Sequence, residues 1–220
     1  MTWRVLMLGT AVAALTLTFG SASSAEDGSD IDYNRLGGYI ELGGVYAWSS
    51  FGRSDLNIDG DSAGGFALRL GNRFDQFWAV EFQYEFLAQR TVTAKNDEAT
   101  MALGATTEFY THQTTFNFRV YPFASEEDGF FQPILAGRIQ PFALAGLGVT
   151  IIDTPEGDAV GFVSRFGLGV DLYATKNIVL SLEGTYALSS GSANAETAGG
   201  QLPVGGLDHV SLGVGATYRF

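Results

Sequence analysis

Apolar and polar residues alternate along much of this chain with a period of two. In the last twelve residues, HVSLGVGATYRF, apolar side chains occupy every second position from Val210, while His209, Ser211 and Arg219 share the other parity. The segment WAVEFQYEF, which begins at Trp78, repeats the pattern with aromatic residues opposite two glutamates. Successive side chains of a β-strand point to opposite faces, so each segment predicts a strand with one apolar and one polar face.

Segments of this kind predict an all-β protein with eight antiparallel strands. The strands are expected at 38–49, 63–73, 78–89, 111–121, 141–152, 161–173, 178–188 and 208–220. Tight connections near 74–77 and 174–177 alternate with longer polar ones at 50–62, 90–110 and 189–207. Short turns at one end and long loops at the other are typical of an up-and-down transmembrane β-barrel of the bacterial outer membrane.

Two parts of this arrangement stay open. The fifth segment, PFALAGLGVTII at 141–152, carries no charge, so its facing is undecided. The connection 122–140 lies at the end where turns should be short. We favour an elaborated turn over an extra strand there, because Pro133 and Pro141 suit a strand interior poorly. A barrel of ten strands stays an alternative.

Residue size indicates which face is the interior. A soluble barrel turns its apolar face inward, whereas a membrane barrel turns it outward. The polar faces here consist mostly of Gly, Ala, Ser and Thr with scattered charges, and the apolar faces carry large residues such as Phe82, Phe118 and Phe166. Small side chains suit a narrow lumen, so the apolar faces are predicted to contact lipid.

The polar faces would bring five acidic and five basic residues into the lumen. An isolated buried ion is costly, whereas paired and hydrogen-bonded ions are tolerated, so we expect an ion-pair network with a structural role. Its expected members are Glu41, Arg69, Arg73, Glu81, Glu85, Arg119, Arg165, Asp171, Glu183 and Arg219. Glu85 and Arg119 are the favoured members because they lie on neighbouring predicted strands.

The first 25 residues have the three parts of a secretory signal peptide. Arg4 precedes an apolar run of about 15 residues, and small residues lead to Ala25. The run is shorter than the roughly 17 to 25 residues of a membrane-spanning helix, so cleavage after Ala25 is favoured over an uncleaved anchor. Removal of 1–25 leaves 195 of the 220 residues, as a short periplasmic segment at 26–37 and a barrel at 38–220.

Composition narrows the partners and the chemistry. The chain has no cysteine, which excludes disulfides and thiolate sites. Its formal net charge is −12, and −13 once Arg4 is lost, so it would repel a phosphate backbone and nucleic acid is an unsuitable partner. Beyond the signal segment no run of 18 apolar residues occurs, which excludes a helical membrane protein.

With QPFALAGLG in its middle and GVGATYRF at its end, the chain resembles the small outer-membrane β-barrel proteins of Gram-negative bacteria, a group that includes OmpA-type, OmpX/Ail-type and OmpW-type barrels. The resemblance implies insertion in the outer membrane, contact with its lipid and lipopolysaccharide, a monomer, and no cofactor. It also implies that the last strand is the signal read by the barrel-assembly machinery. The residues that would carry this signal are Val214, Ala216, Tyr218 and Phe220.

The leading functional hypothesis is a non-enzymatic scaffold that presents surface loops, in envelope integrity, adhesion or surface interaction, because the lumen of eight strands only just holds its own side chains. The alternative is a narrow channel for small or apolar solutes, as in OmpW-type barrels. A lipid A-modifying enzyme is disfavoured. His209 and Ser211 share a face, but Asp208, the carboxylate that would orient the histidine, has the opposite parity.

One predicted loop resembles part of a calcium site. The stretch DLNIDGD at 55–61 matches the first half of a calcium-binding loop, but Phe66 stands where a bidentate glutamate is expected. An acidic solvated loop is therefore favoured, and a weak calcium site is the second hypothesis. Its ligands would be Asp55, Asn57, Asp59 and Asp61.

Overall fold

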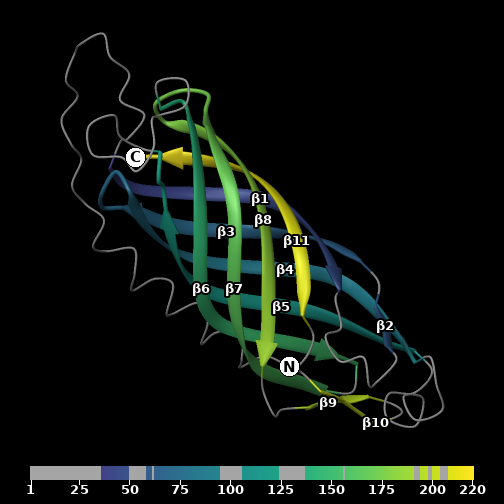
Figure 1. The fold of residues 1–220 in the computed structure, drawn as a ribbon. Helices are drawn as coiled ribbons and strands as arrows, with labels where there is room; N and C mark the ends of the chain where they lie inside the picture. Colours follow the sequence, from purple (N-terminus) through teal and green to yellow (C-terminus); the bar gives the residue numbers. More distant parts are fainter. Residues whose placement is uncertain are drawn as a thin grey trace, which may run out of the picture.

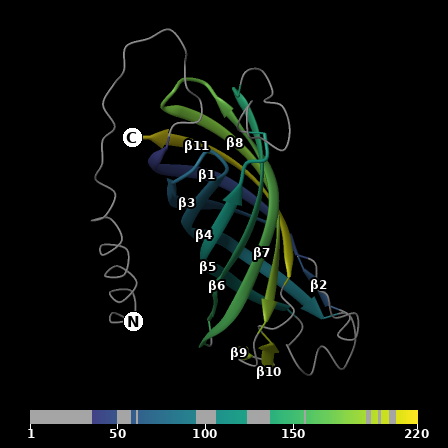
Figure 2. The same ribbon diagram turned by 60° about the vertical axis from the view of Figure 1, so that its left-hand side comes forward.

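The fold is a closed barrel of eight antiparallel strands, seen from two sides in Figures 1 and 2. The computed structural model describes residues 36–49, 58–60, 62–94, 106–123, 137–155, 157–190, 194–197, 200–203 and 208–220. The barrel strands are β1 (Gly37–Ser49), β3 (Ala63–Arg73), β4 (Trp78–Ala94), β5 (Thr106–Val120), β6 (Ile139–Thr154), β7 (Gly157–Tyr173), β8 (Ile178–Ser190) and β11 (His209–Arg219). In this part of the chain no helix is long and apolar enough to cross a membrane.

Each barrel strand pairs with its neighbours in sequence order, and β1 pairs with β11 to close the cylinder. The closing register places Tyr39 opposite Arg219 and Ser49 opposite His209. Three short strands lie outside this ring. β2 (Ile58–Gly60) pairs with the end of β4, and β9 (Asn194–Thr197) pairs with β10 (Gly200–Pro203).

The two ends of the barrel differ. The short connections 74–77 and 174–177 lie at the end where the last strand finishes, which we name the turn end. The opposite end, with β2, β9 and β10, is the loop end (Figure 1). At the turn end the Phe220 amide donates to the Gly38 carbonyl at 3.0 Å, and the side chain of Asn177 donates to the Arg219 carbonyl at 2.7 Å, so the terminal strand is held in place by main-chain and side-chain bonds.

The alternation pattern located all eight barrel strands but shortened five of them at the loop end. β4, β5, β6, β7 and β8 extend further toward the loop end than expected, and β2, β9 and β10 fall within stretches that were expected to be polar loops. Within the 122–140 connection, residues 122–123 and 137–138 form turns, 139–140 belong to β6, and 124–136 lie outside the described residues. The eight-stranded ring answers the question of a ten-stranded barrel.

Large apolar side chains cover the outside of the barrel. The exposed fractions of Leu147, Phe162 and Leu168 are 69%, 70% and 70%. Most inward positions are polar or small, as the alternation predicts, but large side chains such as Leu87, Phe109 and Ile152 also face inward. β6, whose facing was undecided, turns Phe142, Leu144 and Thr150 inward.

Glycines on the inner face make room for the large side chains beside them. A Cβ on Gly71 would lie 2.2 Å from the ring of Tyr39, and one on Gly169 would lie 2.3 Å from the ring of Phe142. By contrast, a Cβ on Gly44 or Gly184 would meet nothing within 4 Å. The inner glycines therefore fit the aromatic side chains that fill the turn end.

Candidate functional site: the lumen ion-pair network

Glu183, on β8, lies at the centre of the charged lumen. Its two carboxylate oxygens accept from three arginines on three other strands: Arg69 at 2.7 Å, Arg165 at 2.9 Å and Arg119 at 3.0 Å. The Glu183 side chain is about 1% exposed. One acid thereby joins β3, β5 and β7 to β8 across the barrel.

Arg119, on β5, is the matching basic centre. Its guanidinium lies 2.9 Å from Glu81 and 3.0 Å from Glu183, and reaches Glu41 at 3.8 Å and Asp171 at 3.9 Å. These four carboxylates come from four different strands, β4, β8, β1 and β7. Because attraction between opposite charges is little screened in a buried site, one arginine in this position holds opposite walls together.

The remaining ion pairs extend the network along the lumen. Arg69 pairs with Glu41 as well as with Glu183, and Arg165 donates to Glu85 at 2.7 Å. Among the described residues, these ion pairs connect five carboxylates and three guanidinium groups, and all eight groups were predicted members. Those eight are Glu41, Arg69, Glu81, Glu85, Arg119, Arg165, Asp171 and Glu183.

Neutral side chains also donate hydrogen bonds to the carboxylates. Tyr39 donates to Glu81 at 2.7 Å, Thr217 donates to Glu41 at 3.0 Å, and Gln83 donates to Glu85 at 3.0 Å. Asp171 accepts from Ser181 at 2.8 Å and from Tyr121 at 3.1 Å. These bonds matter because a buried ion pair is tolerated only when its remaining lone pairs are also satisfied.

The other two predicted arginines lie nearer the turn end among aromatic rings. Arg73 donates to Gln140 at 2.7 Å and to Tyr173 at 3.0 Å, and its guanidinium lies 4.2 Å from the centre of the Tyr121 ring. Arg219 lies over the Tyr173 ring at 4.9 Å. These distances suit cation–π contacts. Together with Tyr39, Phe142 and Leu144, these groups fill the turn end of the lumen.

The charged groups of the network are closely packed. The hollow between Arg69, Glu183 and Gly213 is too small to hold a water molecule. The arginines and carboxylates of the network are all 3% exposed or less.

The favoured pair, Glu85 and Arg119, belongs to one network through different partners. In the register of β4 and β5, Arg119 lies opposite Ala79 and Glu85 lies opposite Gln113. Arg119 therefore contacts Glu81, while Glu85 contacts Arg165 from the far wall. Neighbouring strands alone did not determine the partners, because pairing in a barrel also depends on stagger and on contacts across the lumen.

Reasoning from charge missed the aromatic and amide members of the site. Tyr39, Tyr121 and Tyr173 each stand two positions from a predicted lumen charge, at Glu41, Arg119 and Asp171. The same parity rule that selected the charges therefore also placed these tyrosines inside. Phe142 had no such signal, because its strand carries no charge in the predicted segment.

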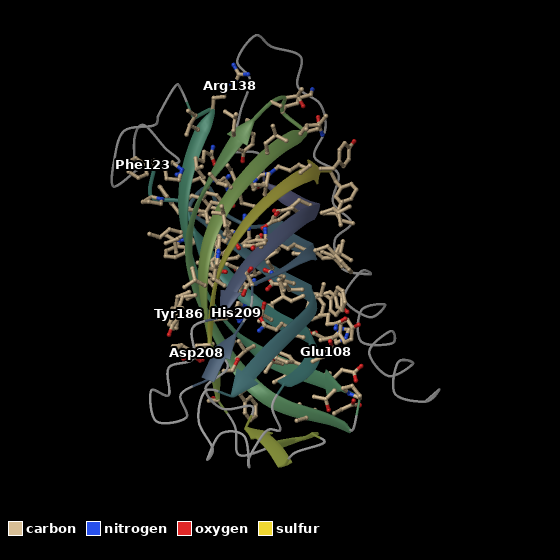
Figure 3. All side chains as sticks on the ribbon, turned by 90° about the vertical axis from the view of Figure 1, so that its right-hand side faces the viewer. Glu108, Phe123, Arg138, Tyr186, Asp208 and His209 are labelled. Carbon is tan, nitrogen blue, oxygen red and sulfur yellow. The ribbon has the colours of Figure 1, made fainter. Side chains whose placement is uncertain are left out.

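The side chains considered for catalysis do not form a triad. His209 (labelled in Figure 3) lies inside the barrel. It is 3.7 Å from Glu85, and the Ser211 hydroxyl pairs with Thr185 at 2.6 Å. Asp208 points to the other face, where it accepts from the Ser189 amide at 2.9 Å and from Tyr186 at 3.4 Å. The carboxylate and the histidine are therefore on opposite faces, as their parity predicted.

Two further sets of predicted residues have different outcomes. Val214, Ala216, Tyr218 and Phe220 all face outward at β11 or just beyond it, and the rings of Tyr218 and Phe220 meet edge to face at 5.5 Å.

Of the suggested calcium ligands, Asp55, Asn57 and Asp61 lie outside the described residues, and Asp59 is described only through the backbone pairing of β2. Among the described residues no cluster of three or more potential metal ligands occurs.

Comparison with known proteins is informative only at the level of structure. No family model matches the chain, and no curated protein matches it. The crystal structure of Neisserial surface protein A (NspA) has 15% sequence identity to this chain, and the match covers 83% of this chain and 97% of that one with a TM-score of 0.54. The crystal structure of the outer membrane protein OprG from Pseudomonas aeruginosa has 17% sequence identity to this chain. That match covers 87% of this chain and 99% of OprG, with a TM-score of 0.59. The chain therefore shares the closed eight-stranded fold of these small outer-membrane β-barrel proteins.

Proposed function

We propose that this chain is a non-enzymatic outer-membrane protein whose barrel is sealed by the lumen ion-pair network and serves as a scaffold for its loop-end segments. The observation that carries the proposal is the position of Glu183 and Arg119, which together bind charged groups from β1, β3, β4 and β7 across the lumen. A barrel crossed in this way has no free path for a hydrated ion.

The outer surface supports the membrane location. Its apolar side chains are exposed to an extent that water would disfavour, and lipid would cover them. Aromatic pairs stand near both ends of this surface: Trp78 stacks on Phe118 at 4.9 Å near the turn end, and Tyr46 meets Trp48 at 4.9 Å near the loop end. Rings at both interfaces are typical of outer-membrane barrels.

The orientation follows from the two ends. Bacterial barrels of this type have short periplasmic turns and longer extracellular loops, so the turn end would face the periplasm and the loop end the exterior. Lipid and lipopolysaccharide would then surround the barrel. The long strands β4 to β7 would raise one side of the wall above the membrane, where its hairpins can meet molecules outside the cell.

The first test is location and leakage. The full chain, expressed in a Gram-negative host, should fractionate with the outer membrane and run on gels with heat-dependent mobility. Purified and refolded into potassium-loaded vesicles, it should release potassium no faster than protein-free vesicles do, with a wide porin as the positive control. Rapid release by the folded chain would favour the narrow-channel alternative, and recovery in the soluble fraction would refute the membrane assignment.

A further inference from the structure

The chain has two histidines, and the barrel places them on opposite faces. His112, on β5, faces outward, where its Nδ1 lies 2.8 Å from the Tyr84 hydroxyl. His209, at the loop-end start of β11, faces the lumen and is 2% exposed. Histidine is the side chain whose charge ordinarily changes between pH 5 and 8. A histidine buried beside charged groups therefore gives a barrel a means of responding to pH.

In the lumen, the imidazole of His209 faces Glu85, on β4. Nε2 of His209 lies 3.7 Å from Oε1 of Glu85, which is too long for a hydrogen bond but close enough for attraction between charges. The other oxygen, Oε2, accepts from Arg165 at 2.7 Å and from Gln83 at 3.0 Å. Within the described part of the chain Oε1 accepts no hydrogen bond. That oxygen is therefore available to the imidazole.

The charged groups around the imidazole come from two strands. β4 provides Glu85, and β7 places Arg165 opposite Ala187, which in turn lies opposite the histidine. β1 and β8, the strands that flank β11, place the uncharged residues Ser49 and Ala187 opposite the histidine. Arg165 also donates to Glu183 at 2.9 Å, so its charge is divided between two carboxylates. Glu85 is thus bound to a shared arginine and has one oxygen to offer a second cation.

Burial and charge act in opposite directions on the proton of this imidazole. Burial disfavours a charged ring, whereas a carboxylate within about 4–6 Å favours it. A ring protonated on both nitrogens brings both a hydrogen-bond donor and a positive charge to Oε1 of Glu85. In a buried site this attraction is little screened, so the ion pair is the arrangement that the geometry favours.

We propose that His209 and Glu85 form a pH-sensitive clasp: the protonated imidazole forms an ion pair with the carboxylate across the lumen, and the neutral imidazole releases it. β11 and β4 are not paired with each other, because β1 and β3 lie between them in the ring. The clasp therefore joins walls that no main-chain ladder joins. The loop end of the barrel would be held most firmly in mildly acidic surroundings. This inference goes beyond the proposed scaffold role, and it applies equally to a sealed and to a conducting barrel.

The pH dependence of stability tests the clasp. Because the folded barrel gains the ion pair only with the protonated ring, the unfolding midpoint of the full refolded chain should fall by about 2–4 °C from pH 6 to pH 8. His209→Gln, which keeps a polar side chain that carries no charge, should remove this fall. His112→Gln is the matched control and should keep it. A wild-type midpoint that does not fall, or an equal fall in His209→Gln, would overturn the proposal.

A second measurement leaves His209 in place, so it does not depend on the folding of a His209 variant. In nitrogen-15 nuclear magnetic resonance spectra of the refolded barrel, the His209 ring should have the shifts of a charged imidazole at pH 6. The spectrum of His112→Gln identifies which signals belong to His209. As the pH rises and the ring loses its charge, amide protection factors at the loop-end start of β11 should fall. A ring that is neutral at pH 6, or unchanged protection as its charge is lost, refutes the clasp.

Discussion

The two halves of the lumen are built from the same kind of strand but packed by different means. Toward the turn end, guanidinium groups, carboxylates and aromatic rings cross the barrel and bind groups on opposite walls. Toward the loop end, smaller neutral side chains such as Thr111, Thr115 and Thr150 line the wall. Long charged side chains can span a narrow barrel and short ones cannot, so closure depends on the turn-end half.

The largest expected effect comes from breaking the turn-end half at its centre. Glu183→Gln removes the charge that three arginines share, and it leaves those buried cations with fewer acceptors. Breaking a buried pair in this way costs about 3–5 kcal/mol, so the variant should unfold at clearly lower urea concentration in vesicles. Glu108→Gln, at an exposed outward position of β5, is the control and should change the midpoint little. Equal effects of the two substitutions would refute the central role of Glu183.

A second prediction concerns the fit between glycines and rings. Gly71→Val would place side-chain atoms against the Tyr39 ring, which is itself held by its bond to Glu81, so we expect a loss of about 1–3 kcal/mol from overpacking. Gly184→Val adds the same atoms to the outer face, where a Cβ meets nothing within 4 Å, and should be neutral or slightly stabilising. Urea unfolding of both variants checks the contrast. A stable Gly71→Val barrel would show that the turn end is loosely packed.

A third prediction addresses the tip of the turn end. Asn177→Ala removes the side-chain hydrogen bond to the Arg219 carbonyl, and with it about 0.5–1.5 kcal/mol of stability. The effect should appear first where β11 meets β8, as faster amide hydrogen exchange in the last residues of the chain. Unchanged exchange there would mean that the strand pairing alone holds the terminal residues.

The smallest expected effect lies at the tip of the loop end. Asp153 and Asp158 face each other across the β6–β7 hairpin, outside the segments 141–152 and 161–173 that were predicted to span the membrane. Burial, together with the charge of Asp158, raises the pKa of Asp153. The folded hairpin then binds a proton more readily than the unfolded chain, so stability should fall slightly as the pH rises from about 4 through the raised pKa.

Asp153→Asn should remove this pH dependence, because an amide next to Asp158 carries no charge to repel it. Unfolding midpoints measured from acidic to neutral pH, for the wild type and the variant, check the prediction. A wild-type midpoint that rises over this range would contradict it.

Much of the fold could be predicted from alternation alone. A period of two located every barrel strand, and the size of the residues on the two faces indicated the inside, since large rings such as Phe162 need space that a narrow lumen lacks. The loop-end limits of β4 to β7 were harder to predict, because a strand segment outside a membrane would not need a continuous apolar face. β2, β9 and β10 escaped notice for the same reason.

The candidate site was predictable in its membership and not in its connections. Parity placed the charged residues on the inner face, but the partners of Arg119 depend on barrel stagger and on how far each side chain reaches across the lumen. The filling of the turn end by Phe142 needed the pairing of β6 with β7, because only then does the space opposite Gly169 become visible. The proposed role of the loop-end segments would depend on contacts outside the barrel, which strand patterning does not encode.

Single-channel recording in planar bilayers tests the sealed lumen most directly. The full chain would be refolded, shown to be folded by heat-dependent gel mobility, and inserted into a bilayer under voltage. If the ion-pair network closes the barrel, the bilayer stays silent. Discrete conductance steps from the wild-type barrel, changed in size by Arg119→Glu, would show that ions pass through the network and would contradict the sealed lumen.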